Sequence, residues 1–294
     1  MKRSSPREHH LPGLISREHT FVVPLDHARP DGPHRLELFA RELAAPDRAG
    51  DALPWLVFLQ GGPGFGAPRP LGTEGWIKRA LQDFRVLLLD QRGTGRSALV
   101  WAQTLARRAG PQAQADYLAH FRADAIVRDA EAVRAKLIGK RRWTALGQSY
   151  GGFCAVTYLS LAPEGLDGAL IAGGLPPLER PAEDVYRATY RRVLEKNRRF
   201  YERYPGDARR ARDLVEHLKA HAVTLPGGGA LTPRRFQQLG MGLGASDGFE
   251  RLHYLMEDAW VGGRGGLELG LPFLRAVEAQ PAFECHPIYA LLHE

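Results

Sequence analysis

A single serine stands between two glycines in Gly147-Gln148-Ser149-Tyr150-Gly151, directly after a short apolar run and before the helix-like stretch "GFCAVTYLSLA". A strand that turns sharply into a helix forces the residue at the turn into a strained backbone conformation, and its neighbours have to be glycine to avoid clashes. The pattern predicts that the Ser149 hydroxyl is held above a sheet. A glycine-rich turn without a chemical role fits the same five letters, so the motif alone leaves both interpretations open.

The stretches on either side of this motif alternate between strand-like and helix-like patterns. Residues 20–25 and 34–44 have β-branched or alternating apolar character and predict an opening hairpin. Residues 123–139 carry apolar side chains at three- and four-residue steps, which predicts a crossover helix. Continuous apolar runs that end in turns are typical of buried parallel strands, and they occupy residues 54–62, 85–93, 142–149 and 168–174.

The pattern changes after about residue 178. Residues 183–222 are helical in pattern and densely charged, and no strand-like run returns before the end. Further helix-like stretches cover residues 233–240, 248–260 and 271–280. The sequence therefore predicts an α/β core with a mostly parallel sheet over residues 1–178 and a helical cap domain over residues 179–294.

Two more motifs follow predicted strands of the core. Gln60-Gly61-Gly62-Pro63-Gly64 supplies glycines that let the backbone approach a substrate, although a plain turn explains them too. An acyl-transfer site of this kind needs a second N–H donor from such a loop, in addition to the N–H that follows the serine. The charged stretch 90–97, "DQRGTGRS", predicts a structural turn in which the Asp and an Arg pair beneath the serine loop.

The three motifs "GGPG", "DQRGTGRS" and "GQSYGG", in this order, resemble the proline iminopeptidase family of serine α/β-hydrolases, in its longer bacterial branch. The resemblance implies that Ser149 is the nucleophile and that the N–H groups of Gly62 and Tyr150 form the oxyanion hole. It also implies release of an N-terminal residue, usually proline, from peptides. Gln60 departs from the family, which commonly has histidine there; the backbone donors are expected to be unaffected.

A serine nucleophile needs a general base and an orienting acid, which in this fold follow in the order Ser, Asp or Glu, His. The stretches after residue 174 offer no strands of the kind that these residues normally follow. The histidines in this part of the chain fit surface or packing roles better; they are His217, His221, His253, His286 and His293. We therefore expect the last strands, the acid and the base to lie beyond residue 294.

An aminopeptidase has to bind a substrate ammonium at a fixed distance from its serine, and a nearby carboxylate does this. Cap glutamates perform this task in the family, which makes Glu257 and Glu294 the candidates here. A solvated glutamate on a helix surface is the competing interpretation of both. Trp260 and Tyr289 are candidates for an apolar wall around a proline ring, and core packing explains them equally well.

Two alternatives stay open at this stage. A carboxylesterase or amide hydrolase would use the same serine without needing a substrate amine. A non-catalytic binding protein, or a catalytically incomplete fragment of the same fold, would need neither the serine nor a substrate amine. Epoxide hydrolases and haloalkane dehalogenases are disfavoured, because they carry aspartate where Ser149 stands. Labelling of Ser149 by a fluorophosphonate would separate the enzymes from the incomplete protein.

Composition narrows the remaining classes. The net charge of +7 is carried mainly by arginines scattered among acids, which disfavours nucleic acid as a partner. Cys154 and Cys285 are too few for a disulfide framework or a zinc site. The N-terminus lacks the apolar core of a signal peptide, and no apolar run is long enough to span a membrane, so the cytoplasm is the default compartment. We expect no metal or other cofactor, and the sequence leaves the oligomeric state open.

Overall fold

The computed structural model describes residues 7–73, 75–263, 265–280 and 283–292. Its contacts divide the chain into a core unit, Met1–Leu178 with Phe283–Glu294, and a cap unit, Glu179–Ala282. The domain prediction placed all of 179–294 in the cap, so the two differ over the last segment. The physical reason is Ile288, which is 3% exposed and belongs to the hydrophobic cluster of the core.

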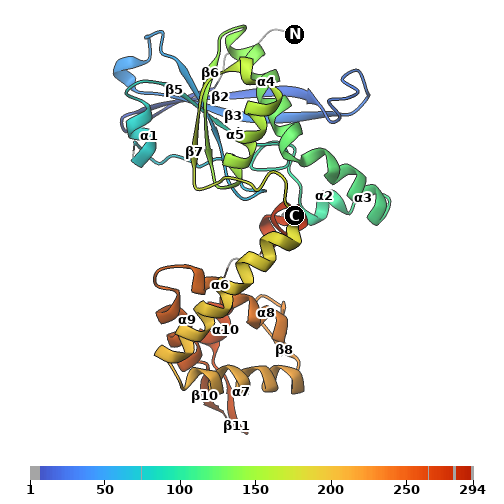
Figure 1. Ribbon diagram of the computed structural model, residues 1–294, viewed down its shortest axis with the longest axis vertical. Coiled ribbons are helices and arrows are strands. Elements are labelled where there is room, and N and C mark those ends of the chain that lie inside the picture. Colours follow the sequence, from blue (N-terminus) through green and yellow to red (C-terminus); the bar gives the residue numbers. More distant parts are fainter. Residues whose placement is uncertain (1–6, 74, 264, 281–282, 293–294) are drawn as a thin grey trace. The chain divides into compact units, whose positions relative to one another are not determined.

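In the described part of the core unit, seven strands form one sheet in the order β1-β2-β3-β5-β4-β6-β7 (Figure 1). The first three pair antiparallel with their neighbours, and β3 also pairs antiparallel with β5. The strands are β1 Glu8–Leu11, β2 Leu14–Pro24, β3 Arg35–Ala44, β4 Trp55–Leu59, β5 Arg85–Leu89, β6 Trp143–Gln148 and β7 Leu166–Ala172. The opening hairpin and all four buried runs expected from the sequence are therefore strands.

The strands β5, β4, β6 and β7 are parallel, so their carboxyl ends lie along the same edge of the sheet. The chain passes from β4 to β5 on one side and then to β6 on the other side of β4. Ligands of open α/β sheets bind outside the carboxyl ends of the strands where the strand order reverses in this way. The loop that begins at Gln60 and the turn at Ser149 both lie at this position.

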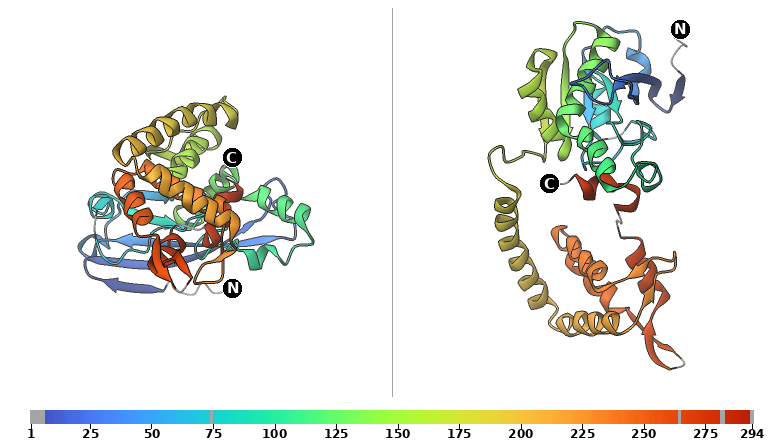
Figure 2. Two further views of the ribbon diagram at one scale, coloured as in Figure 1. Left: turned by 90° about the horizontal axis from the view of Figure 1, so that it is seen from below. Right: turned by 90° about the vertical axis from the view of Figure 1, so that its right-hand side faces the viewer.

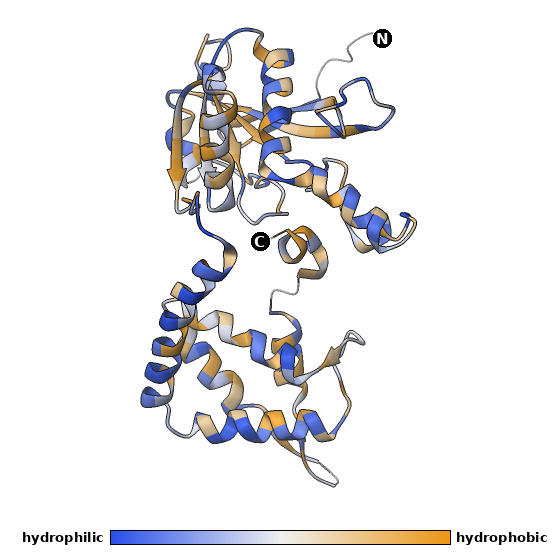
Figure 3. Cartoon of the chain, turned by 45° about the vertical axis from the view of Figure 1, so that its right-hand side comes forward, coloured by the Kyte–Doolittle hydropathy of each residue, from blue (hydrophilic) through white to orange (hydrophobic). Residues whose placement is uncertain are grey.

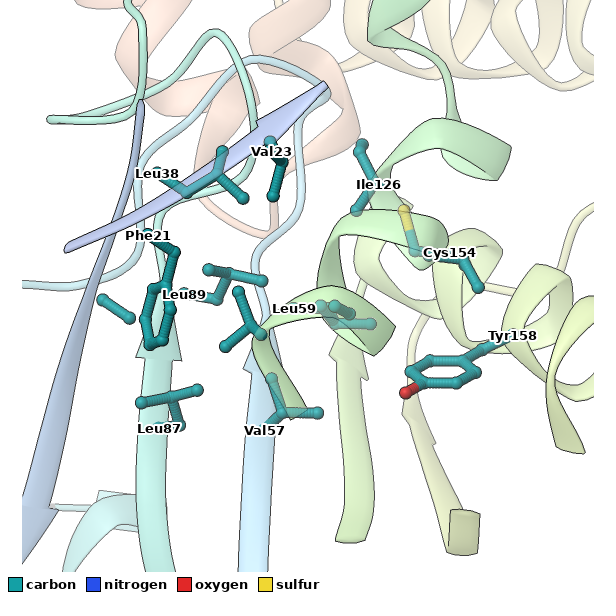
Figure 4. Close-up of a cluster of buried hydrophobic side chains, with 14 of the residues drawn as sticks. Phe21, Val23, Leu38, Val57, Leu59, Leu87, Leu89, Ile126, Cys154 and Tyr158 are labelled. Carbon is teal, nitrogen blue, oxygen red and sulfur yellow. The ribbon is translucent and has the colours of Figure 1, made fainter. Parts of the chain in front are cut away.

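Both faces of β4 and β5 are buried, as their continuous apolar runs predict. The outer parallel strand β7 differs from that prediction, because only its first residue is buried. Alternate residues of β4 and β5 enter two different hydrophobic clusters, because successive side chains of a strand point to opposite faces. One cluster contains Val57, Leu59, Leu87 and Leu89 (Figure 4). The other contains Leu56, Phe58, Val86 and Leu88.

Helices from the intervening segments cover the sheet. The helices α4 and α5 pack against each other and contribute buried side chains to the first cluster, whereas α1 contributes to the second. The helix predicted over residues 123–139 corresponds to α4, Ala123–Ile138, and the helix predicted after Ser149 corresponds to α5, Tyr150–Leu161. The shorter helices of the core are α1 Gly75–Ala80, α2 Ala102–Leu105, α3 Pro111–Leu118 and α11 Pro287–Leu291.

The cap unit has a hydrophobic cluster of its own, which includes Phe200, Leu214 and Phe273. Its first helix buries only Phe200 and is largely hydrophilic along its length (Figure 3). The described helices are α6 Ala182–Arg203, α7 Asp207–Ala220, α8 Pro233–Gln238, α9 Gly248–Glu257 and α10 Leu271–Glu278.

The cap prediction was wrong on one point, because strands do return after residue 178. The cap unit contains two small pairs of antiparallel strands besides its helices. The pairs are β8 Val223–Thr224 with β9 Ala230–Leu231, and β10 Trp260–Gly263 with β11 Gly266–Leu269. These strands have two to four residues and turn at glycines, so they lack the long apolar run by which a strand is recognised. Across the described ranges, no helix combines the length and the hydropathy that crossing a membrane requires.

A buried ion pair ties the turn after β5 to α4. The Arg92 side chain is 0% exposed and donates to both carboxylate oxygens of Asp129, at 2.6 Å each. Arg92 also donates to the backbone carbonyls of Leu25 and His120, and His27 lies 2.7 Å from Asp129. A buried pair of this kind contributes to stability only while both partners and their hydrogen bonds are intact.

Replacement of Asp129 by Asn is therefore expected to lower the free energy of unfolding by about 3–5 kcal/mol, because it leaves the buried Arg92 guanidinium without a counter-charge. The matched control is Asp124→Asn on the same helix, whose pair with Arg128 is about half exposed. That change should cost at most about 1 kcal/mol. Denaturant unfolding measures both, and similar losses for the two variants would show that the buried pair does not stabilise the core.

Candidate functional site

Ser149 occupies a one-residue turn between β6 and α5. Its backbone has φ 54° and ψ −120°, a region that residues other than glycine rarely adopt. A conformation of this kind costs on the order of 1–3 kcal/mol and persists only where the surrounding structure enforces it. The Ser149 N–H donates to the Ala172 carbonyl at 2.9 Å, and the Ser149 carbonyl accepts from Gly152 at 2.8 Å. Neighbouring strand and helix thus hold both sides of the strained residue.

The glycines around Ser149 are required by close backbone contacts. A Cβ atom at Gly147 would lie 2.0 Å from the Gly151 carbonyl oxygen, and one at Gly151 would lie 1.9 Å from the Leu59 carbonyl oxygen. A Cβ at Gly174, after β7, would lie 1.8 Å from the Ser149 carbonyl oxygen. Real Cβ atoms essentially never come this close to other atoms, so the G-x-S-x-G spacing follows from the packing of three strand ends around one turn.

The loop after β4 passes directly beside the serine. A Cβ at Gly61 would lie 2.8 Å from the Ser149 Cβ, which places Gly62 next to the turn. Tyr150 is the first residue of α5, so its N–H has no carbonyl partner within the helix. The structure thus brings the three residues Ser149, Gly62 and Tyr150 into one region at the carboxyl edge of the sheet. The roles of Gly62 and Tyr150 as oxyanion donors stay predictions.

The turn at residues 90–97 supports the loop after β4 through hydrogen bonds. The Asp90 carboxylate is fully buried and accepts hydrogen bonds from the backbone N–H groups of Ala67 and Arg96, at 2.9 Å each. Its ion-pair partner is Arg69, at 2.6 Å. The expected pairing of Asp90 with an arginine of its own turn was therefore wrong, because Arg92 points the other way, to Asp129. The Gln91 amide completes the support by donating to the Gln60 carbonyl at 3.1 Å.

Two ionisable groups on the first turns of α5 are unsuited to act as nucleophile or base. Cys154 lies one turn beyond Tyr150 and is fully buried. Burial raises the pKa of its thiol to about 12, so the reactive thiolate does not form near neutral pH. Burial also raises the pKa of the Tyr150 hydroxyl far above its ordinary value. Among these side chains, Ser149 remains the candidate nucleophile.

None of the contacts given for the described histidines after Ser149 is a contact with the serine. His253 lies 2.9 Å from the buried Asp207 carboxylate within the cap unit, and His217 stacks on His221. His286 lies in the core unit, where its Nδ1 is 3.1 Å from the Gly64 carbonyl. His293 lies outside the described residues. The prediction that the acid and the base follow residue 294 stays a prediction.

The structure describes only one of the two glutamates predicted to bind the substrate ammonium. Glu257 ends α9 in the cap unit, where its side chain is 47% exposed and lies 3.8 Å from the Arg210 guanidinium. Glu294 lies outside the described residues. Trp260, a candidate for the apolar wall, packs edge-on against His217 within the cap unit. Tyr289 instead belongs to the core unit. Its ring packs edge to face against Phe65 of the loop after β4, with the ring centroids 6.0 Å apart.

Sequence reasoning named Tyr289 as a candidate for the site but missed that the segment 283–292 belongs to the core unit. The segment lies against the core unit, and Figure 2 shows it in red beside the core loops. The available signal was the apolar spacing in "HPIYALL", which indicates a helix with one buried face but not which surface buries it. No cluster of three or more His, Cys, Asp or Glu side chains suited to a metal ion occurs among the residues that the structure describes.

Comparison with known proteins adds an independent line of evidence. Residues 54–257 match the model of a family described as the alpha/beta hydrolase fold. The chain is 53% identical over 291 residues to the proline iminopeptidase of Aeromonas sobria, across 99% of this chain and 67% of that protein. It is 39% identical over 257 residues to a proline iminopeptidase of Aspergillus aculeatus, across 85% of this chain and 57% of that protein.

Among solved structures, a proline iminopeptidase-related protein of Thermus thermophilus is 26% identical, with a TM-score of 0.33 over 53% of this chain and 44% of that chain. The family assignment rests on the sequence matches, since the family model covers residues 54–257 and the bacterial relative matches nearly the whole chain. The chain belongs to the α/β hydrolases and, among them, to the proline iminopeptidase family. The fold class and the family expected from the motifs are thereby confirmed.

Because of the packing around Ser149, we expect Gly147→Ala to lower the free energy of unfolding by about 3–5 kcal/mol. The backbone atoms next to the added methyl group cannot rotate away from it. The control is Gly168→Ala on the adjacent strand β7, where an added Cβ meets nothing within 4 Å. That variant should be neutral or slightly stabilised, by up to about 1 kcal/mol. Denaturant unfolding compares them, and equal stability of the two variants would contradict the packing argument.

Proposed function

We propose that the full-length gene product is a serine aminopeptidase that releases an N-terminal residue, preferably proline, from peptides through an acyl-enzyme on Ser149. The observation that carries the proposal is the strained Ser149 backbone, φ 54°, enclosed by glycines at the carboxyl edge of the sheet. Strain of this kind is retained at functional sites rather than in ordinary turns. The 53% identity to the Aeromonas sobria proline iminopeptidase supports the same activity.

In the proposed reaction, the Ser149 Oγ attacks the carbonyl carbon of the N-terminal residue after a general base takes its proton. The tetrahedral oxyanion accepts hydrogen bonds from the N–H groups of Gly62 and Tyr150. Collapse of this intermediate breaks the peptide bond, and the protonated base gives its proton to the nitrogen of the departing peptide. The N-terminal residue remains as an ester on Ser149, which water then hydrolyses. The base and its orienting acid are expected after residue 294.

Substrate selection is proposed to combine a charge contact with an apolar contact. Glu294 and Glu257 are the candidates for binding the substrate ammonium, which a peptide presents at a fixed distance from its first carbonyl carbon. Tyr289 contacts Phe65, three residues after Gly62, and is therefore the better supported candidate for a wall against a proline ring. Trp260 remains a second candidate in the cap unit.

Ser149→Ala in the full-length gene product is expected to reduce kcat for proline arylamide by roughly four orders of magnitude or more, because the acyl-enzyme cannot form. The control is Ser160→Ala on the same helix, whose hydroxyl donates to the Val156 carbonyl. It should keep both the activity and the labelling of Ser149 by a fluorophosphonate. Substantial activity in Ser149→Ala would mean that another residue is the nucleophile.

Glu294→Gln is expected to impair substrates with a free N-terminus by roughly ten- to a hundredfold in kcat/KM, the effect of about 1.5–3 kcal/mol from one charge-assisted contact. Simple esters carry no ammonium and should be almost unaffected. Glu257→Gln should show the same contrast more weakly, since Arg210 already lies near that carboxylate.

The control for both variants is Glu216→Gln, which changes an exposed cap glutamate that pairs with Lys219. It should leave both substrate types unchanged. Steady-state kinetics on proline arylamide and a simple ester measure the contrast. An equal loss on both substrates in Glu294→Gln would mean that this residue supports the fold, and a carboxylesterase would then be the better description.

A further inference from the structure

The segment 283–292 closes over the loop that carries Gly62. The short helix α11, Pro287–Leu291, inserts Ile288 between the loop after β4 and the turn after β5. A Cβ at Gly64 would lie 2.9 Å from the Ile288 Cβ, and one at Gly93 would lie 2.6 Å from its Cδ1. Because Ile288 is 3% exposed, the segment is anchored in the core rather than lying loosely on it.

His286, which precedes α11, contacts this loop in two ways. Its Nδ1 lies 3.1 Å from the Gly64 carbonyl oxygen, and its ring stacks on Phe65 with centroids 3.9 Å apart and an interplanar angle of 23°. A carbonyl oxygen only accepts, so the hydrogen of this bond belongs to Nδ1. The backbone N–H of His286 donates to the Phe283 carbonyl at 2.9 Å, which fixes the backbone from which the ring projects.

The glycines of this loop restrict its conformation only weakly, so contacts with neighbouring segments matter. The Gln91 amide holds the start of the loop at the Gln60 carbonyl, and His286 holds it at Gly64. Gly62 has φ 126° and Gly64 has φ 94°, and glycine populates many backbone conformations at similar cost. Pro63 has no N–H with which to fix the loop through a hydrogen bond of its own. The direction of the Gly62 N–H is therefore set by neighbours, and the Gly64 carbonyl is the atom that His286 binds.

We propose that His286 is a positioning residue, which holds the loop after β4 through the Gly64 carbonyl and the Phe65 ring so that the Gly62 N–H points toward the developing oxyanion. This inference rests on the proposed acyl-transfer function. Oxyanion stabilisation depends on donors placed before the reaction, and removing one such donor typically lowers kcat by about 10²–10³. Misplacing a donor acts on the same step.

The test compares two variants in the full-length gene product. His286→Phe keeps a ring for stacking on Phe65 but removes the donor, and it is expected to lower kcat by about ten- to a hundredfold with KM nearly unchanged. His286→Asn places an amide N–H near the former Nδ1 and should recover most of that kcat. The control is His34→Phe, an exposed histidine of the core unit, which should leave kcat unchanged.

Kinetics on both proline arylamide and a simple ester keep the outcome separate from that of the proposed substrate preference, because oxyanion stabilisation serves both. The thermal unfolding midpoint is measured for each variant. A drop in kcat on both substrates, with rescue by Asn and a midpoint close to that of the parent, supports the proposal. An unchanged kcat in His286→Phe, or equal losses in the Phe and Asn variants, overturns it.

Failure of the proposed function would look different. The parent enzyme would then fail to hydrolyse proline arylamide while still turning over the ester, or Ser149 would escape fluorophosphonate labelling altogether. If only the substrate preference fails, the effect of His286→Phe on ester hydrolysis still decides the positioning role. If Ser149 is not labelled, the oxyanion has no source, and the positioning role is overturned together with the proposed function.

Discussion

The close packing of backbone around Ser149 is the constraint on which the rest of the core depends. The turn brings the ends of β4, β6 and β7 together, because Gly151 approaches the Leu59 carbonyl and Gly174 approaches the Ser149 carbonyl. No side chain fits in these gaps, so the three strands, the turn and the start of α5 have one mutual arrangement. The strained conformation of Ser149 persists because this packing and the backbone hydrogen bonds to Ala172 and Gly152 hold it in place.

Charged groups secure the surroundings of this turn in two separate networks. Asp90 binds the loop after β4 through backbone N–H groups and Arg69, whereas Arg92, two residues later, binds Asp129 and carbonyls of the opening hairpin segment. One turn thus connects the predicted oxyanion loop with the helix α4. Asp90, Arg92 and Asp129 are buried, whereas the Arg69 side chain is 41% exposed. Each buried charge contributes to stability only while its partner is present.

The segment 283–292 adds a third kind of support, made of aromatic and apolar contacts. His286 and Tyr289 contact Phe65, and Ile288 fills the space between two glycine turns. The chain leaves the core after β7, forms a unit with its own hydrophobic cluster, and then returns to the loop beside Ser149. Residues far apart in sequence therefore determine the environment of one glycine-rich loop.

The sequence by itself determined the parallel strands, α4, α5 and the position of Ser149 at the turn between β6 and α5. These features depend on local apolar periodicity and on glycines at fixed spacing. Only the tertiary structure decided which arginine pairs with Asp90, that short strands return in the cap unit, and that Ile288 belongs to the core. Pairing partners and the surface that buries an apolar face depend on how distant segments meet. The sequence of a short helix such as α11 shows that one face is apolar. Only the tertiary structure shows which surface buries that face.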